Sequence, residues 1–136
     1  MEQKLYDTVT DCPVIAAIKD DAGLERCLDS DIQIVFVLYG DIVSIPEIVD
    51  RIKKKGKLAM VHADLISGLA GKEIAIDFLK RNTQADGIIS TKLSFIKRAK
   101  ELGMATVFRF FVIDSMAFDN IQKQYEAACP DFVEIL

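Results

Sequence analysis

The sequence predicts a parallel α/β fold of the (β/α) barrel type, and three observations support this prediction. Short apolar, β-branched segments alternate with segments of helical periodicity along the chain. The run IQIVFVL at residues 32–38 is apolar on both faces, as strands of a parallel sheet covered on both sides are. The segments KKKGKLAMVHAD (53–64) and KELGMATVFRFF (100–111) repeat helix, glycine and strand in near register, which favours a barrel over a Rossmann sheet.

Each element is expected from its own residues. In the helix at residues 44–56, for example, Ser44 is the expected N-cap and Gly56 ends the helix. After a polar N-terminal arm, we expect strands at residues 13–18, 32–38, 57–64, 86–90, 104–111 and 131–136, and helices at residues 20–30, 44–56, 71–81, 91–103 and 114–128.

The fold class is therefore a TIM-barrel-like (β/α) repeat with six strands and five helices. A complete (β/α)8 barrel needs two more βα units, which are missing from this chain. The apolar strand at residues 131–136 has no helix after it, and an uncovered edge strand is an aggregation liability. We expect residues 1–136 to form one barrel-like domain that is truncated at its C-terminus.

Composition excludes several classes of protein. With 136 residues and 51% hydrophobic residues, the chain has enough apolar surface for one core. No apolar run reaches the ~18–20 residues that span a membrane, and the N-terminus is acidic, so we expect a cytoplasmic protein with no membrane partner. The three cysteines form no CxxC pair, which argues against a disulfide framework, a zinc site or any other metal site. No GxGxxG or GxxxxGK[ST] motif indicates a nucleotide cofactor.

Charge is unevenly distributed along the chain. The net charge is −4, yet residues 51–100 hold twelve basic and four acidic residues. A segregated basic face binds phosphates through its local field, whatever the net charge. The alternative is that helices in this stretch have lysine-rich solvent faces.

Polar residues that follow the strands are the candidates for a binding site, because the carboxyl ends of parallel strands face the ligand crevice. Strand alternation predicts that His62 and Asp64 point to the same face. The candidate residues are Lys19, Tyr39, Asp41, His62, Asp64, Ser90, Thr91, Lys92, Arg109 and Glu134.

Two of these residues allow more than one interpretation. His62 is the only histidine; it is either a general acid or base oriented by Asp64 or Glu134, or a histidine hydrogen-bonded at a strand end. No second histidine or nucleophile motif supports catalysis. Arg109 lies in an apolar, aromatic strand, so it requires either a structural partner such as Glu134 or an anionic ligand.

Four segments in this order resemble the glycerol-3-phosphate-responsive antiterminators, the glycerol uptake operon antiterminator regulatory proteins of bacteria. They are HADLISGL (62–69), DGIISTK (86–92), FRFFVIDSMA (108–117) and PDFVEIL (130–136). The segments CPVIAAIKD (12–20) and IVFVLYGDI (34–42) also fit, so the resemblance covers residues 12–136. One departure is at strand five, where family members often have a Gln-Arg pair and this chain has Phe108 before Arg109.

The resemblance implies a TIM-barrel-like fold, no catalysis and no cofactor. It implies a regulator that, with glycerol 3-phosphate as effector, acts on the leader mRNA of glycerol-utilisation genes so that transcription passes a terminator. The positions that match the family are His62, Asp64, Gly68, Ser90, Thr91, Lys92, Arg109, Asp114, Ser115 and Glu134. The family continues with two further βα units that include a glycine-rich phosphate site, so here we expect Lys19, His62, Lys92 and Arg109 to contact the effector.

The basic middle of the chain is then the expected RNA surface, on the outer ring of helices. Its residues are Arg51, Lys53, Lys54, Lys55, Lys57, Lys97, Arg98 and Lys100. Two other readings stay open: a phosphate-binding barrel enzyme with His62 as acid or base and Arg109 or Lys92 as anion clamp, and a degenerate fragment. The sequence also leaves open whether the chain is a monomer or a homo-oligomer.

Overall fold

The computed structural model describes residues 2–111 and 115–136, and its strands and helices alternate as the sequence predicts. The strands are β1 (Ile15–Ile18), β2 (Ile34–Val37), β3 (Leu58–His62), β4 (Gly87–Ser90), β5 (Ala105–Phe110) and β6 (Phe132–Ile135). The helices are α1 (Glu2–Asp11), α2 (Asp21–Leu28), α3 (Ile45–Lys54), α4 (Ile74–Asn82), α5 (Leu93–Glu101) and α6 (Ser115–Ala128), with a 3-10 helix, η1 (Ala63–Leu65), after β3.

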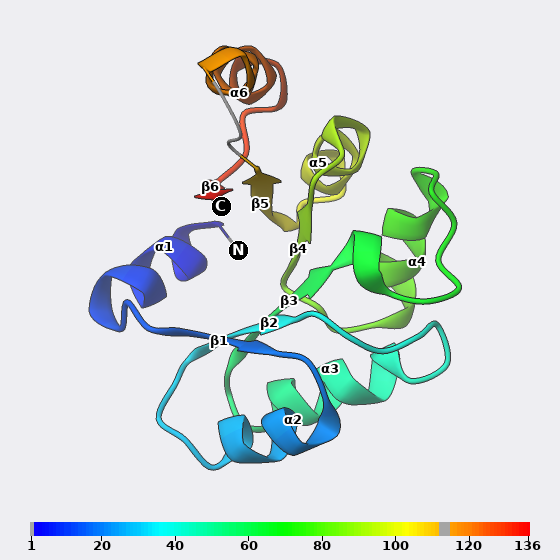
Figure 1. The fold of residues 1–136 in the computed structure, drawn as a ribbon. Helices are drawn as coiled ribbons and strands as arrows, with labels where there is room; N and C mark the ends of the chain where they lie inside the picture. Colours follow the sequence, from blue (N-terminus) through cyan, green and yellow to red (C-terminus); the bar gives the residue numbers. More distant parts are fainter. Residues whose placement is uncertain (1, 112–114) are drawn as a thin grey trace.

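The six strands form one parallel sheet in the order β1-β2-β3-β4-β5-β6. The sheet curls, and α2 to α6 follow one another around its convex side (Figure 1). Neighbouring strands are consecutive in sequence because each βα unit returns the chain to the next position in the sheet. This arrangement confirms the predicted TIM-barrel-like fold class, with six strands in the described residues.

The N-terminus differs from the prediction. Residues 2–11 form helix α1 instead of a polar arm, so the expected number of five helices was one too low for the described part of the chain. Leu5 and Val9 are four residues apart and therefore share one face of the helix. Leu5 is 3% exposed and packs, with Val9, against the concave face of the sheet. Helix α1 thus lies on the opposite side of the sheet from the other helices, between β1 and β6 (Figure 1).

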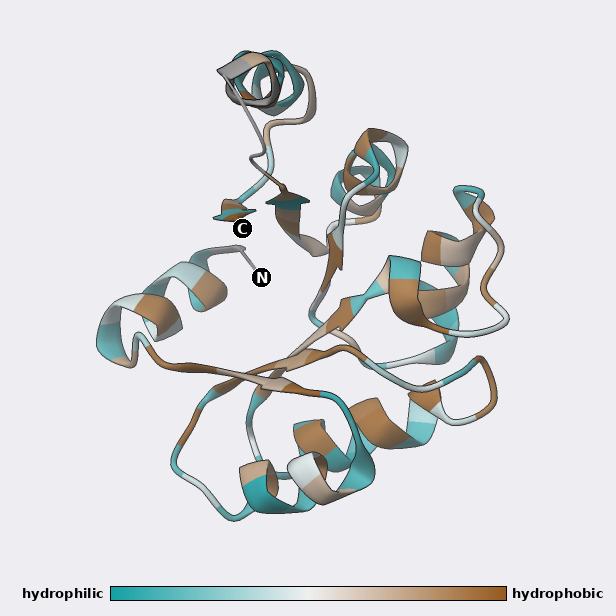
Figure 2. Cartoon of the chain, in the orientation of Figure 1, coloured by the Kyte–Doolittle hydropathy of each residue, from teal (hydrophilic) through white to brown (hydrophobic). Residues whose placement is uncertain are grey.

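Alternate residues of each strand enter two separate hydrophobic clusters. On β2, Val35 and Val37 pack under the outer helices, whereas Ile34 and Phe36 face the concave side. Both faces of the strands are therefore apolar, and the apolar stripes of the outer helices turn toward the sheet (Figure 2). Buried thiol Cys27 belongs to the outer cluster, and Cys12 and Cys129 are also free thiols.

Close approach of β4 and β5 depends on Gly87. A Cβ atom at this position would lie 2.2 Å from the carbonyl oxygen of Ala105 and 2.7 Å from the methyl group of Met60. No side chain fits at such distances, so only glycine allows this pairing.

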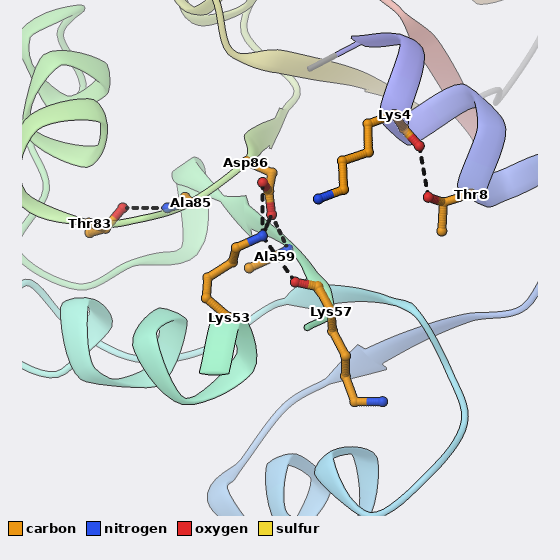
Figure 3. Close-up of polar contacts among 8 residues, drawn as sticks. All are labelled: Lys4, Thr8, Lys53, Lys57, Ala59, Thr83, Ala85 and Asp86. Carbon is orange, nitrogen blue, oxygen red and sulfur yellow. Dashed lines mark hydrogen bonds and ion pairs between the residues drawn. The ribbon is translucent and has the colours of Figure 1, made fainter. Parts of the chain in front are cut away.

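A partly buried ion pair holds α3 against the start of β4. The Lys53 ammonium lies 2.8 Å from a carboxylate oxygen of Asp86, which is 5% exposed (Figure 3). The same carboxylate accepts a hydrogen bond from the backbone N–H of Ala59, and Lys53 also donates to the carbonyl oxygen of Lys57. These contacts link α3, β3 and β4 at the amino ends of the strands. None of the helices within residues 2–111 and 115–136 is long and apolar enough to cross a bilayer.

Candidate functional site

A cavity of about 370 Å³ lies on the concave face of the sheet. Helix α1 contributes Leu5 and Val9 to its wall, and most of the lining is apolar. Two charged side chains, from β5 and β6, interrupt the apolar lining. The lining residues are Leu5, Val9, Ile15, Ala17, Phe36, Val107, Arg109, Phe132, Val133 and Glu134.

The two charged side chains form an ion pair. Arg109 and Glu134 are register partners on β5 and β6, and the Arg109 Nη2 atom lies 2.9 Å from the Glu134 Oε1 atom. Their side chains are 13% and 26% exposed. Of the two interpretations of Arg109, the structure shows the ion pair with Glu134, and an anionic ligand at Arg109 stays untested. The two residues lie in the wall of the apolar cavity, and their opposite charges neutralise each other.

His62 ends β3 on the same concave face, because it alternates with Leu58 and Met60 of the inner cluster. It is 3% exposed, and its Nδ1 atom has no hydrogen-bond partner among the described residues. Burial lowers the pKa of His62 below its ordinary 6.5, and the nearby charge of Arg109 lowers it further, against the opposite effects of Asp64 and Glu134. His62 is therefore neutral at pH 7.

His62, Arg109 and Glu134, hereafter the interior triad, share an uncommon property. The atoms Nδ1 of His62, Nε of Arg109 and Oε2 of Glu134 are buried without a partner in the described part of the chain. Buried polar atoms in folded proteins are nearly always hydrogen-bonded, and each exception requires an explanation. Three such atoms on one concave face are what a preformed site for a polar ligand presents.

Asp64 has a different surrounding from the predicted one. The strand ends at His62, and Asp64 lies in η1, so strand alternation does not orient its side chain. Its carboxylate accepts hydrogen bonds from the Ser90 hydroxyl at 2.6 Å and from the Thr91 backbone N–H and hydroxyl at 2.9 and 2.6 Å. Burial opposes ionisation, but these hydrogen bonds outweigh it and lower the pKa of Asp64. Asp64, Ser90 and Thr91 thus join the β3–α4 and β4–α5 loops.

The two predicted lysine ligands lie at the surface. Lys19 follows β1 and is exposed; Lys92, also exposed, precedes α5 with its ammonium 4.8 Å from the centre of the Phe95 ring. Gly68 has a φ of +90° in the β3–α4 loop, a conformation that favours glycine. Asp114 lies outside the described residues, and Ser115 begins α6, with its side chain outside the described part.

Tyr39 and Asp41, two further polar residues after β2, are occupied locally. The Tyr39 hydroxyl donates to Asp21 at 2.7 Å, and burial together with this contact raises the pKa of Tyr39. The Asp41 carboxylate accepts from the backbone N–H groups of Val43 and Ser44 before α3. These contacts organise the β2–α3 loop and leave both residues outside the cavity lining.

Most cations of the predicted RNA surface have partners within the fold. Arg51 pairs with Glu25, Lys53 with Asp86, Lys54 with Asp50, and Arg98 with Asp77 and Glu101. Lys100 donates to the carbonyl oxygen of Cys129. These side chains are spread over α3 and α5, which α4 separates (Figure 1).

Among the cations of the predicted RNA surface, Lys57 differs most from the prediction. It is 4% exposed, and its ammonium donates to the carbonyl oxygens of Ser30 and Ile32, so RNA has no access to it in the folded protein. Lys55 and Lys97 are exposed and have no ion pair among the described residues. The predicted RNA surface therefore has fewer exposed cations without an ion pair than the sequence suggested.

The apolar wall of the cavity was absent from the predicted site. Its residues lie at the inner positions of β1, β2, β5 and β6 and on α1. The four-residue spacing of Leu5 and Val9 was the signal for the helix that covers the cavity. The inner strand positions carried no separate signal, because both faces of each strand are apolar.

Comparison with known proteins identifies the family. A model of the family described as glycerol-3-phosphate responsive antiterminator matches residues 14–136. The chain belongs to this antiterminator family. The resemblance predicted from the four sequence segments is therefore confirmed, and it extends through all six strands.

Two solved structures have the antiterminator fold seen here. The glycerol uptake operon antiterminator regulatory protein from Listeria monocytogenes matches with a TM-score of 0.86 and 33% identity, over 90% of this chain and 66% of that chain. A glycerol uptake operon antiterminator-related protein from Thermotoga maritima matches with a TM-score of 0.80 and 35% identity, over 90% of this chain and 69% of that chain.

A curated relative is more similar in sequence. The uncharacterized protein YgcP of Escherichia coli (strain K12) is 50% identical over 124 residues, which are 91% of this chain and 65% of that protein. This antiterminator-family chain thus spans about two thirds of the length of the relatives that it matches.

Proposed function

We propose that the chain is a regulator that binds glycerol 3-phosphate on the concave face of the sheet and acts on leader mRNA as a transcription antiterminator. The observation that carries the ligand part is the interior triad, whose three buried polar atoms have no hydrogen-bond partner within residues 2–111 and 115–136. A cavity of about 370 Å³ adjoins Arg109 and Glu134, and ligand pockets of about 300 Å³ and above hold small metabolites. A cytoplasmic location, where mRNA is made, is part of this proposal.

The expected effector contacts divide into two groups. His62, Arg109 and Glu134 are inside the barrel, whereas Lys19 and Lys92 are exposed at the carboxyl ends of β1 and β4. Asp64, Ser90 and Thr91 bind one another. We assign them the role of holding the loops that flank the site, which differs from direct contact with the effector.

For the RNA surface, the end of the barrel opposite the site is the best candidate. Helices in a parallel α/β fold run antiparallel to the strands, so their C-termini lie at the amino ends of the strands. The last turns of α3, α4 and α5 carry Lys54, Lys80 and Arg81, and Arg98. We assign the exposed Lys55, Lys80 and Arg81 to a basic rim at this end of the barrel. Lys54 and Arg98 also lie there, but each pairs with acidic residues of the fold.

The enzyme alternative receives less support from the site. A general acid or base needs a partner that orients the imidazole ring. Asp64 is engaged by Ser90 and Thr91, Glu134 by Arg109, and His62 Nδ1 accepts or donates no hydrogen bond among the described residues. We therefore propose a binding role for His62 and no catalysis.

The test is binding of the chain to the leader RNA of a glycerol-utilisation operon, followed by fluorescence anisotropy with and without glycerol 3-phosphate. We expect ligand-dependent binding that weakens steeply with salt, because lysine contacts to phosphates release counterions. Lys55→Glu should weaken binding and lower the salt slope, whereas Lys57→Met should destabilise the fold instead. RNA affinity that is equal with and without glycerol 3-phosphate would contradict the proposal.

A further inference from the structure

We infer that the interior triad recognises the hydroxyl groups of a polyol, and that it leaves the phosphate group of the effector to other residues. This inference rests on the proposed function for the identity of the effector. It adds which part of the effector each residue binds. Three properties of the triad support it: its net charge, its free donors and acceptors, and its surroundings.

The net charge of the triad is close to zero. Arg109 is neutralised by Glu134 at 2.9 Å, and the buried His62 is neutral at pH 7. A phosphate group carries a charge of about −1.5 to −2 at this pH. To bind Arg109, it must either face the Glu134 carboxylate or displace it, and displacement leaves a largely buried carboxylate without its partner. Both arrangements oppose phosphate binding at this position.

The unpartnered atoms require a ligand group that both donates and accepts. Arg109 Nε carries a hydrogen and only donates, while Glu134 Oε2 only accepts. A hydroxyl group has one hydrogen to donate and lone pairs to accept, so a single hydroxyl satisfies both atoms. An ionised phosphate oxygen only accepts and leaves Glu134 Oε2 unsatisfied. His62 is on the same concave face but outside the cavity lining, and its Nδ1 atom offers a donor or an acceptor, depending on the tautomer, to a second hydroxyl.

The surroundings of the triad also suit an uncharged group. Val107, Phe132 and Val133 line the cavity next to the ion pair. An apolar wall packs against the carbon chain of a polyol, but a charged group placed against it loses hydration without compensation. The exposed Lys19 and Lys92 have no ion pair among the described residues and lie where the chain leaves β1 and β4. The phosphate group is thereby directed toward the rim of the barrel.

His62 provides a direct reporter, because it is the only histidine of the chain. Its imidazole nitrogen and carbon resonances can be followed by NMR without assignment of other residues. The titrants are glycerol, glycerol 3-phosphate, propyl phosphate, which lacks both hydroxyl groups, and inorganic phosphate. We expect glycerol and glycerol 3-phosphate to shift the His62 resonances, and propyl phosphate and inorganic phosphate to leave them unchanged.

The Glu134→Gln variant distinguishes whether Arg109 binds a hydroxyl group or the phosphate group of the effector. The amide has the size of the carboxylate but loses its charge and half of its acceptor capacity. We expect the affinity for glycerol to fall about tenfold, as for the loss of a hydrogen bond to a charged group. If Arg109 instead holds the phosphate, removing the competing carboxylate should raise the affinity for inorganic phosphate and glycerol 3-phosphate. Glu47→Gln, which makes the same chemical change at an exposed carboxylate of α3, is the matched control and should leave these affinities unchanged.

Each outcome is decisive. Shifts of His62 with inorganic phosphate, or tighter glycerol 3-phosphate binding by Glu134→Gln, overturn the polyol assignment while the proposed function stands. No shift with glycerol or glycerol 3-phosphate also overturns it. A third outcome is that glycerol shifts the His62 resonances, that glycerol 3-phosphate binds no more tightly than glycerol, and that RNA affinity is the same with and without glycerol 3-phosphate. This outcome supports the polyol assignment and contradicts the proposed function. The folded spectrum of each variant shows that a loss of binding is not a loss of structure.

Discussion

Arg109 and Glu134 face each other on adjacent strands with 2.9 Å between Nη2 and Oε1, and each keeps one buried polar atom without a partner among the described residues. The pair lies in the wall of an otherwise apolar cavity. An ion pair that served only to stabilise the sheet would be expected to satisfy its remaining donors and acceptors, since each unsatisfied atom costs stability. The incomplete satisfaction is what distinguishes a binding site from a structural bridge here.

Breaking the pair on one side should cost more stability than removing it. We expect Arg109→Met to lower the free energy of unfolding by about 1–3 kcal/mol, because Glu134 then remains largely buried without its partner. The double variant Arg109→Met with Glu134→Gln should recover most of this loss. Urea unfolding of both single variants and the double variant measures the coupling. Additive losses would show that the pair contributes no interaction to stability.

The pKa of His62 predicts a pH dependence of stability near neutrality. Burial and Arg109 lower the pKa of the folded state below 6.5, so the unfolded chain binds more protons as the pH falls through this value. The contribution of the neutral His62 to the free energy of unfolding should therefore be present above pH 6.5. It should decrease as the pH falls toward 5, with a slope of at most about 1.4 kcal/mol per pH unit.

The control for this prediction is His62→Asn, which cannot titrate. Urea unfolding at pH 7.5 and pH 5 should show a smaller pH effect in the variant than in the wild type. Hydrogen bonds hold the pKa values of Asp41, Asp64 and Asp77 below the ordinary 3.8, so these carboxylates titrate under more acidic conditions. Equal pH dependence in both proteins would show that His62 is not the responsible group.

Asp64→Ala should loosen the loop after β4. The substitution removes all three hydrogen bonds that the carboxylate accepts from Ser90 and Thr91. We expect a loss of about 1–3 kcal/mol and faster hydrogen exchange of the Thr91 amide. Glu73→Gln, at an exposed position of the same β3–α4 segment, is the control and should change neither quantity. Unchanged exchange of Thr91 in Asp64→Ala would refute the anchoring role.

Gly87→Ala tests the close pairing of β4 and β5. The added Cβ meets the Ala105 carbonyl oxygen at 2.2 Å, so one strand must move. We expect a destabilisation of at least about 1–3 kcal/mol, as for overpacked cores, with a lower thermal midpoint. At Gly71, a Cβ meets only the end of the flexible Lys92 side chain, at 3.3 Å, so Gly71→Ala should be close to neutral. Equal thermal midpoints of the two variants would contradict this account.

Parts of the site were predictable because they follow from chain-local rules. Residues that end parallel strands meet at one end of the sheet, so His62 and Arg109 were found from their positions alone. Strand alternation does not apply to Asp64, because β3 ends at His62 and Ala63–Leu65 form a 3-10 helix. Lys57 was grouped with surface cations, although carbonyl oxygens of Ser30 and Ile32 hold it inside the fold.

The sequence by itself determined the order of the elements, the parallel sheet and the family, because apolar periodicity, glycine stops and segment order are properties of neighbouring residues. Only the tertiary structure decided which polar groups have partners. Hydrogen bonds and ion pairs such as Arg109 with Glu134 join residues far apart in the chain, and their geometry depends on how the sheet curls and where α1 packs. The unsatisfied atoms of the interior triad, on which the proposed site rests, could therefore appear only after the strands were assembled.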